Sequence, residues 1–373
     1  MNVKQYPFYI KATVILFGII LITYVLFNLR DILIPLAFAI IFSILLNPLN
    51  TWFRKHKIPK ILSITLTLFL AFVVFGGMMY FLSSQIARFS DTLPLLKQKF
   101  SILITQFGQW AQLHFGVTIQ KQVELMNKAL NSSSTLLGST VSTAFGTIGI
   151  IMLLPVYIFL FLFYKTLILN FLFEVYAEEN SKQVSDILNE TKSAIQSYMV
   201  GLLIESLIVA ILNSTALLIL GVKYAFLLGI IGALLNMVPY IGGLIAIALP
   251  VLIATVTKDG YGTQLGIIIA YTIIQLIDNN ILVPRIVSSK VQINALISII
   301  TVLLGAALWG VPGMFLSIPF VAILKIIFDR IPDLKPWGKL LGDTVPTRHK
   351  GEIWDLRRSK GKASISEKIV SKL

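Results

Sequence analysis

Four polar side chains lie close together near the end of an otherwise apolar run: Gln275, Asp278, Asn279 and Asn280. Gln275, Asp278 and Asn279 have the i, i+3, i+4 spacing that places side chains on one face of a helix. Pro284 follows and is expected to break that helix, because its ring interrupts the helical hydrogen-bond pattern. Carboxylate and amide groups beside a helix break could bind the hydroxyl groups of a small solute. The alternative is that these side chains only cap a polar helix end.

A second acidic residue, Glu205, interrupts the apolar run from Tyr198 to Val222. An acid within such a run is costly unless it is paired, protonated or wetted, and it is therefore a candidate for function. Glu205 could carry a proton, or bind a cation or a polar solute, together with Asp278. The alternative is a position near the end of the run, where the side chain reaches water or pairs with a lysine.

The composition indicates whether these apolar runs lie in water or in lipid. Of the 373 residues, 56% are hydrophobic and only 13% are charged, and the mean hydropathy is +0.86. Soluble domains carry about 25% charged residues, so much of this chain is expected to lie in lipid. The predicted fold class is all-α, a polytopic helical membrane protein with about six to eight membrane crossings.

The net charge of +14 is distributed as membrane proteins distribute it. Lysine and arginine gather in the turn at 54–60 and in the tail after Lys325, as expected for cytoplasmic segments. Both termini are therefore predicted to be cytoplasmic. We expect no nucleic-acid partner, because the positive charges do not form a patch on a folded surface.

Residues that support enzymatic or metal chemistry are scarce. The chain has no cysteine, and its three histidines, His56, His114 and His349, lie outside the apolar runs. The G-x-S-x-G, H-E-x-x-H and Walker A motifs do not occur. We therefore expect neither catalytic activity nor a metal site or cofactor.

The uncharged runs and the charged stretches between them divide the chain into regions. The predicted regions are N-terminal membrane helices at 1–87, an extramembrane amphipathic helical segment at 88–140, a membrane transport core at 141–340 and a basic cytoplasmic tail at 341–373. Within the core we predict a fourth membrane helix at 141–164 and a surface helix at 165–197.

Two stretches in the last third are too long for one crossing, about 224–257 and 291–324, each with 34 residues and no charge. A straight helix of that length would measure about 50 Å. Both contain prolines and glycines, so we predict two re-entrant hairpins whose tips need protein or water as hydrogen-bond partners. The alternative is two kinked spanning helices, which would make eight crossings instead of six. The predicted gating and hairpin tips are Pro239, Gly242, Gly243, Pro284, Pro312 and Gly313.

One further asparagine lies in each of these long stretches: Asn236 and Asn294. Their amides could contact a solute, although tying down loose backbone is the favoured role for both. The full predicted substrate-binding set is Gln275, Asp278, Asn279, Asn280, Asn236 and Asn294. The residues predicted to couple transport to an ion or proton are Glu205 and Asp278.

Three patterns in the last third resemble the autoinducer-2 exporter family of bacterial membrane proteins. They are Val238-Pro239-Tyr240-Ile241-Gly242-Gly243, Gln275-Leu276-Ile277-Asp278-Asn279-Asn280 and Trp309-Gly310-Val311-Pro312-Gly313-Met314. The resemblance covers about residues 10–340. It implies a bacterial inner-membrane permease, and founding members of the family export autoinducer-2, a small hydroxylated quorum-sensing signal. It also implies a homopentamer in which each subunit has its own pathway.

The sequence departs from the pattern of this family after Pro284. Where many relatives have a His-Pro pair, this chain has Ile293-Asn294-Ala295. The titratable ring is missing, so any proton coupling would depend on Glu205 and Asp278.

The leading hypothesis is a secondary transporter or facilitator that exports a small polar organic solute, with lipid and solute as its partners. The first alternative is a sodium/proton antiporter, which some members of the family resemble. The second alternative is a non-transporting membrane scaffold. Sodium-dependent proton flux in vesicles would favour the antiporter, and the absence of any flux would favour the scaffold.

Overall fold

The computed structural model describes residues 7–343 apart from 91–92, 116–152, 177–180, 238–241, 259 and 288–292, and every element among the described residues is helical. The elements are α1 (Phe8–Asn28), α2 (Arg30–Lys55), α3 (Lys60–Ser90), α4 (Leu93–Phe115), α6 (Lys165–Tyr176), α7 (Ser181–Ile219), α8 (Ala225–Asn236), α9 (Gly242–Thr257), α10 (Gly262–Ile277), the π-helix η1 (Asp278–Val287), α11 (Ala295–Arg330), the 3-10 helix η2 (Pro332–Leu334) and α12 (Lys335–Leu341). A further helix, Leu153–Phe163, precedes α6 at an angle of 61°. The all-α prediction is confirmed.

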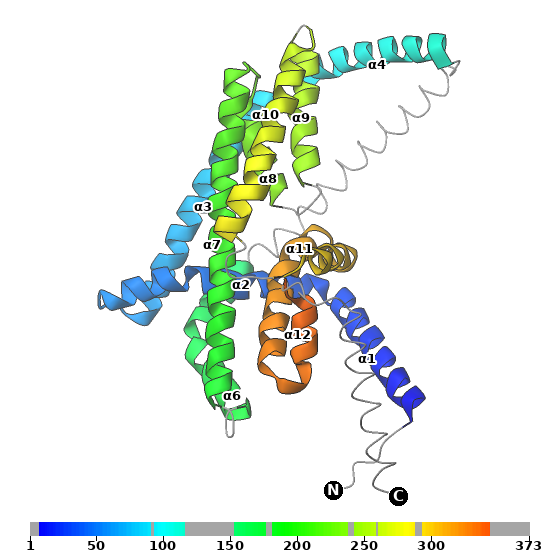
Figure 1. Ribbon diagram of the computed structural model, residues 1–373. Coiled ribbons are helices and arrows are strands. Elements are labelled where there is room, and N and C mark those ends of the chain that lie inside the picture. The colour runs from blue at the N-terminus through cyan, green and yellow to red at the C-terminus, as the bar shows by residue number, and fades with distance from the viewer. Residues whose placement is uncertain are drawn as a thin grey trace, which may run out of the picture.

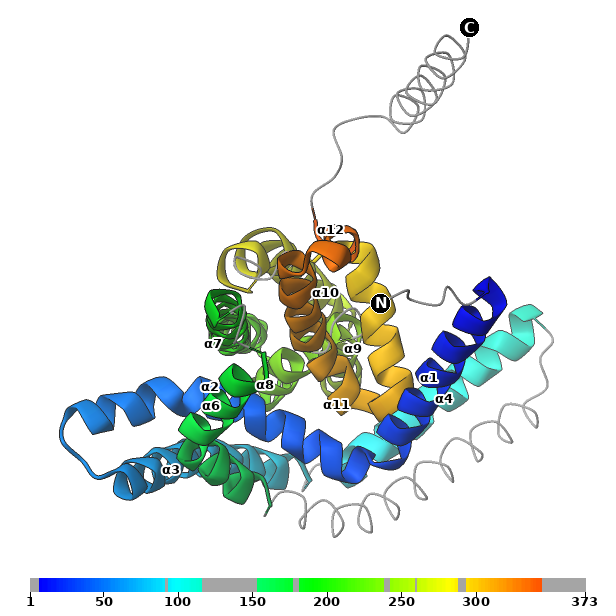
Figure 2. The same cartoon turned by 90° about the horizontal axis from the view of Figure 1, so that it is seen from below.

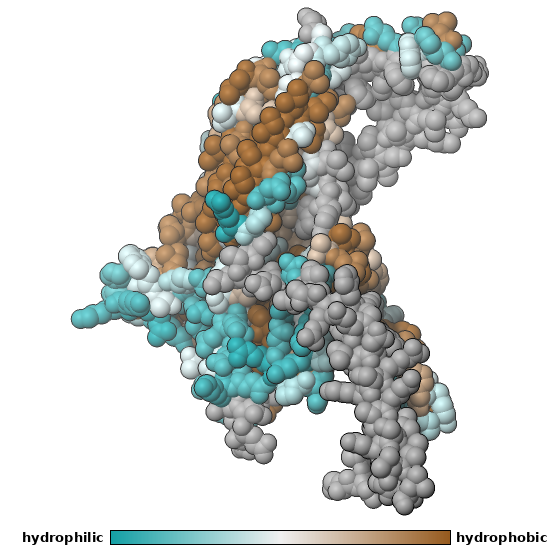
Figure 3. Space-filling model, in the orientation of Figure 1, coloured by the Kyte–Doolittle hydropathy of each residue, from teal (hydrophilic) through white to brown (hydrophobic). Residues whose placement is uncertain are grey.

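Apolar side chains cover much of the molecular surface. Among the described residues, six helices are long and apolar enough to cross a membrane: α1, α2, α3, α7, α10 with η1, and α11. No residue of α1 is buried, and apolar residues dominate the end of the molecule that holds α9 and α10 (Figure 3). Apolar patches of this extent are suited to lipid and not to water. The prediction of a polytopic membrane protein is confirmed.

Polar residues gather at the opposite end of the molecule, around the beginning of α7 and α12 (Figure 3). Arg330, the last residue of α11, pairs there with Asp186 and Glu190 of α7 at N–O distances of 3.3 and 2.7 Å. These ion pairs join the end of α11 to the first turns of α7.

The helix α7 is longer than the sequence pattern indicates. The charged stretch at 165–197, predicted as one surface helix, is divided between α6 and the first turns of α7. α7 has 39 residues and is therefore about 58 Å long. It contains no proline and a single glycine, Gly201, so no residue ends the helix where the membrane run begins.

The stretch at 224–257 folds back on itself. α8 and α9 pack against each other, and α9 also packs on α10 (Figure 1). A Cβ atom on Gly242 would strike the carbonyl oxygen of Leu235. The end of α8 and the beginning of α9 are therefore in backbone contact, as in the predicted hairpin.

The helix α11 folds back at Gly310, which has φ 63° and ψ −141°, a conformation that glycine adopts without steric cost. Gly305 and Gly313 approach so closely across the bend that a Cβ atom on either would strike the carbonyl oxygen of the other. In a straight helix, residues eight apart are separated by about 12 Å. Figure 2 shows the chain reversing at the bend, with the two halves of α11 diverging from it. Both stretches therefore fold back on themselves, as predicted, and their re-entrant position in the membrane stays a prediction.

The helix α10 widens into the π-helix η1 at Asp278. η1 contains Pro284, which has no N–H group for the α-helical hydrogen bond. The helix predicted to break near this proline instead continues past it to Val287, and the change of helix type lies six residues earlier, at Asp278. π-Helical turns are rare and are frequent at functional sites.

Candidate functional site

Asn236 connects two buried acidic side chains. Its amide donates hydrogen bonds to Glu205 Oε1 at 3.2 Å and to Asp278 Oδ2 at 2.8 Å. Glu205 comes from α7, Asn236 is the last residue of α8 and Asp278 is the first residue of η1. Three elements that are distant in the chain therefore meet at one amide.

Both carboxyl groups are shielded from solvent. Glu205 is 4% exposed and Asp278 is 2% exposed, and both contact the amide of Asn236. Neither forms an ion pair with a basic side chain in the described part of the chain. A buried pair of acids without a basic partner needs a proton or a cation as its counter-charge.

A cavity of about 10 Å³ adjoins Asp278 and Asn236, which is room for about one water molecule. Its wall includes Asn213 of α7, Asn236 of α8, Ala246 of α9, Tyr271 of α10 and Asp278. Asn213 Oδ1, the Tyr271 hydroxyl and Asp278 Oδ1 have no hydrogen-bond partner among the described residues. The cavity is thus small, buried and rich in polar groups.

Gln275 lines the same cavity, and the first hairpin is shaped to fit it. A Cβ atom on Gly243, near the start of α9, would lie 2.9 Å from Gln275 Oε1 and 3.6 Å from Asn236 Oδ1. Only a glycine lets the α9 backbone approach these two amides without displacing them.

Two members of the predicted binding cluster, Asn279 and Asn280, are exposed. Asn279 Oδ1 accepts a hydrogen bond from Gln275 Nε2 at 3.4 Å. Asn280 donates to the backbone carbonyl of Leu276 at 2.8 Å. Neither of them lines the cavity beside the acids.

Asn294 is also separate from the acids. Its side chain caps α11 by accepting a hydrogen bond from the Ile297 N–H at 2.9 Å. It also donates to the carbonyl oxygens of Leu340 at 2.7 Å and Gly342 at 3.0 Å. These contacts tie the start of α11 to α12, which is a backbone-fixing role.

The residues predicted as tips belong to three elements. Gly242 and Gly243 begin α9, Pro284 lies within η1, Pro312 and Gly313 follow the bend of α11, and Pro239 lies outside the described residues. Of these residues, Gly243 is the one that approaches the site amides.

Two residues of the cavity, Asn213 and Tyr271, are absent from the sequence-based predictions. Tyr271, Gln275 and Asp278 have i, i+4, i+7 spacing and so share one helical stripe. Asn213 lies two turns beyond Glu205 in α7. Extending the polar stripe by two turns from each acid would have identified both residues.

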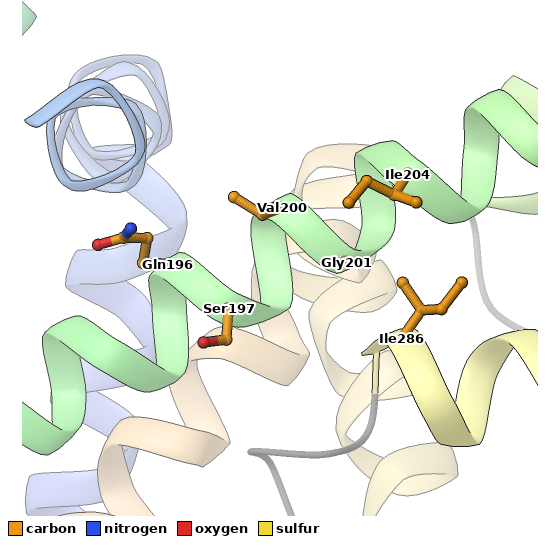
Figure 4. A pocket seen from close by; sticks show the side chains of 6 residues that line it. All are labelled: Gln196, Ser197, Val200, Gly201, Ile204 and Ile286. Carbon is orange, nitrogen blue, oxygen red and sulfur yellow. The ribbon is translucent and has the colours of Figure 1, made fainter. Parts of the chain in front are cut away.

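A larger cavity of about 270 Å³, open to the surface, lies where η1 packs on α7 (Figure 4), and Val200 and Ile204 in its wall are exposed. It is lined by Gln196, Ser197, Val200, Gly201 and Ile204 of α7 and by Ile286 of η1. A Cβ atom on Gly201 would strike the carbonyl oxygen of Ile286, so the two backbones touch there. The volume is near the lower limit of small-molecule sites, about 300 Å³.

The arrangement defines the class of protein. Two helical hairpins, a discontinuous helix and buried acids without basic partners are features of secondary transporters. The chain belongs to the AI-2E family of transporters, because the model of that family, described as AI-2E family transporter, matches residues 13–333. The resemblance seen in the sequence is confirmed.

Individual relatives are similar along most of their length. The chain is 24% identical to YrrI of Bacillus subtilis over 310 residues, which cover 80% of this chain and 86% of that protein. It is 28% identical to YueF of the same organism over 319 residues, with 80% and 83% covered. It is 24% identical to the AI-2 transport protein TqsA of Escherichia coli over 315 residues, with 84% and 90% covered.

Proposed function

We propose that this protein is a secondary transporter that exports a small polar organic solute and binds it at Asp278, Glu205, Asn236 and Gln275. One observation carries the proposal: the amide of Asn236, beside the bend between α8 and α9, donates hydrogen bonds to both buried acids. A movement of this hairpin relative to α7 and η1 would break those hydrogen bonds and change access to the acids.

The chemistry of the site suits a solute with several hydroxyl groups. The two carboxylates accept hydrogen bonds, and the amide of Gln275 can both donate and accept. Hydrogen bonds to carboxylates are about twice as strong as those between neutral groups. Since the name of TqsA connects one relative with AI-2, autoinducer-2 is the first solute to test, and export of a quorum-sensing signal is the proposed role.

The larger cavity at α7 and η1 supports a route to this site. Gln196 and Ser197 give it polar groups, and Ile204 in its wall is the residue before Glu205. The backbone contact between Gly201 and Ile286 lies between these polar groups and the acids along α7. We infer that solute enters this cavity first and that the contact opens for passage.

Proteoliposomes loaded with autoinducer-2 test the proposal. The purified protein should release the signal faster than protein-free liposomes, and Asp278→Ala should abolish the release while the variant remains folded and inserted. Release by Asp278→Ala at the rate of the unchanged protein would remove the assignment of the site.

Sodium/proton antiport is the second candidate function. Two buried acids with no basic partner among the described residues could exchange protons for sodium ions. Sodium-dependent proton flux that disappears in Glu205→Gln would favour this function over solute export.

We also propose a bacterial inner-membrane location with both termini cytoplasmic. Lysine and arginine in the turn at 54–60 and near the end of α11 support this orientation. A homo-oligomer, a pentamer by family resemblance, is proposed as the assembled form. Native mass spectrometry of the detergent-purified protein tests the subunit number.

A further inference from the structure

Three unpartnered polar atoms converge on the small cavity beside the acids. They are Asn213 Oδ1, the hydroxyl oxygen of Tyr271 and Asp278 Oδ1. Asn213 is 2% exposed, Tyr271 4% and Asp278 2%. Each comes from a different element, α7, α10 or η1, so no local turn brings them together.

Such a convergence has an energetic meaning. A buried polar group without a partner is destabilising, and native proteins contain few of them. The other unpartnered side-chain atoms of the described residues, Thr191 Oγ1 and Gln264 Oε1, do not line this cavity. Three unpartnered polar atoms around one cavity indicate a site that binds a polar group.

These polar atoms define the chemistry of the group that the site binds. Asn213 Oδ1 accepts hydrogen bonds, as does Asp278 Oδ1 in the ionised carboxylate, whereas the Tyr271 hydroxyl both accepts and donates. A hydroxyl group matches this set, because it can donate to Asp278 and accept from Tyr271. A water molecule can in addition donate to Asn213. A methyl group can satisfy none of the three.

The size of the cavity agrees with this chemistry. Its volume of about 10 Å³ admits one oxygen-sized group. Small residues keep the space open, since a Cβ atom on Gly232 would lie 3.2 Å from Asn213 Nδ2 and 3.7 Å from the Tyr271 oxygen.

We propose that Asn213 and Tyr271, with Asp278, form a receptor for one hydroxyl group of the transported solute, and that a water molecule fills it when no solute is bound. This inference rests on the proposed function and adds two specificity-determining residues to its site. It predicts that the protein distinguishes a solute hydroxyl from a hydrogen at one position.

The transport test compares autoinducer-2 with an analogue in which one hydroxyl group is replaced by hydrogen, for each hydroxyl in turn. The unchanged protein should release autoinducer-2 at least about tenfold faster than one of these analogues. Tyr271→Phe and Asn213→Leu, which remove the polar atoms and keep the approximate volume, should each bring that ratio close to one. The matched control is Tyr261→Phe, because Tyr261 immediately precedes α10 and is 84% exposed. Its ratio should stay unchanged. An unchanged ratio in both cavity variants would overturn the proposal.

A second measurement is independent of transport. A high-resolution experimental map of the protein without solute should show a water peak within hydrogen-bond distance of all three polar atoms. If the unchanged protein releases no autoinducer-2, the proposed export of that signal is wrong. The water peak in the map then tests the hydroxyl receptor independently of transport. A map in which Tyr271 and Asn213 pair with each other, with no peak between them, would refute it.

Discussion

Glu205 and Asp278 lie on different helices, α7 and η1, and accept hydrogen bonds from one and the same amide, that of Asn236. Neither acid has a basic partner in the described part of the chain. The shared amide belongs to the first hairpin, so the position of the hairpin decides how the two acids are paired. A movement of the hairpin that breaks these hydrogen bonds would therefore change how the charges of Glu205 and Asp278 are compensated.

Replacing Asn236 by leucine should damage both transport and stability. Asn236→Leu keeps a similar volume but removes the donor to both carboxyl groups. Each buried carboxyl group then loses a hydrogen bond. We expect export to fall at least tenfold and the free energy of unfolding to fall by about 1–3 kcal/mol. Flux in proteoliposomes and thermal unfolding in detergent measure the two effects.

The control for that experiment is Asn28→Leu. Asn28 also donates a side-chain hydrogen bond, to the carbonyl of Tyr24 at 2.8 Å, but it is exposed on α1. Both quantities should remain near those of the unchanged protein. Equal losses in the two variants would show that the shared amide has no special role.

The isosteric variants Asp278→Asn and Glu205→Gln separate solute binding from ion coupling. Asp278→Asn should reduce autoinducer-2 release at least tenfold, since a charge-assisted hydrogen bond becomes a neutral one. Glu205→Gln should remove any effect of a proton or sodium gradient on the rate. Asp31→Asn, at an exposed ion pair with Arg30, is the matched control. Gradient-dependent transport that survives both Asp278→Asn and Glu205→Gln would exclude these acids from coupling.

Alanine at Gly313 should destabilise the second hairpin. The new Cβ atom would meet the Gly305 carbonyl oxygen, and overpacking of this kind costs about 1–3 kcal/mol. Gly76 of α3 has no atom within 4 Å of the equivalent Cβ position. Gly76→Ala should therefore be neutral, or stabilising by up to about 1 kcal/mol through helix propensity. Thermal unfolding of both variants checks the difference, and a Gly313→Ala protein as stable as Gly76→Ala would contradict the packing at the bend.

Single cysteines should report the orientation of the chain, because the natural sequence contains none. Lys339→Cys in α12 should react with a membrane-impermeant maleimide only after the cells are opened. Tyr261→Cys, at an 84% exposed position before α10, should react in intact cells. The reverse labelling pattern would place the basic segments outside.

The sequence by itself determines the solvent of this protein and its local structure. Apolar runs of crossing length require lipid and helix, because only a helix satisfies its own backbone in a bilayer. The bends could be predicted for the same reason: 34 uncharged residues with Gly310 and Pro312 near the middle do not fit one straight crossing. The family patterns are also local, so they were recognisable without coordinates.

Tertiary structure alone decided which polar groups meet. Asn279 and Asp278 are neighbours in sequence, yet only Asp278 lines the cavity, while Asn213 reaches it from another helix. Asn294 has the same amide as Asn236 but caps α11. Periodicity shows which residues share one helix face; the angles and depths at which separate helices pack decide which faces touch. That packing is set by contacts between residues far apart in the chain, such as the glycines that allow close backbone approach, and it is therefore invisible in any single segment.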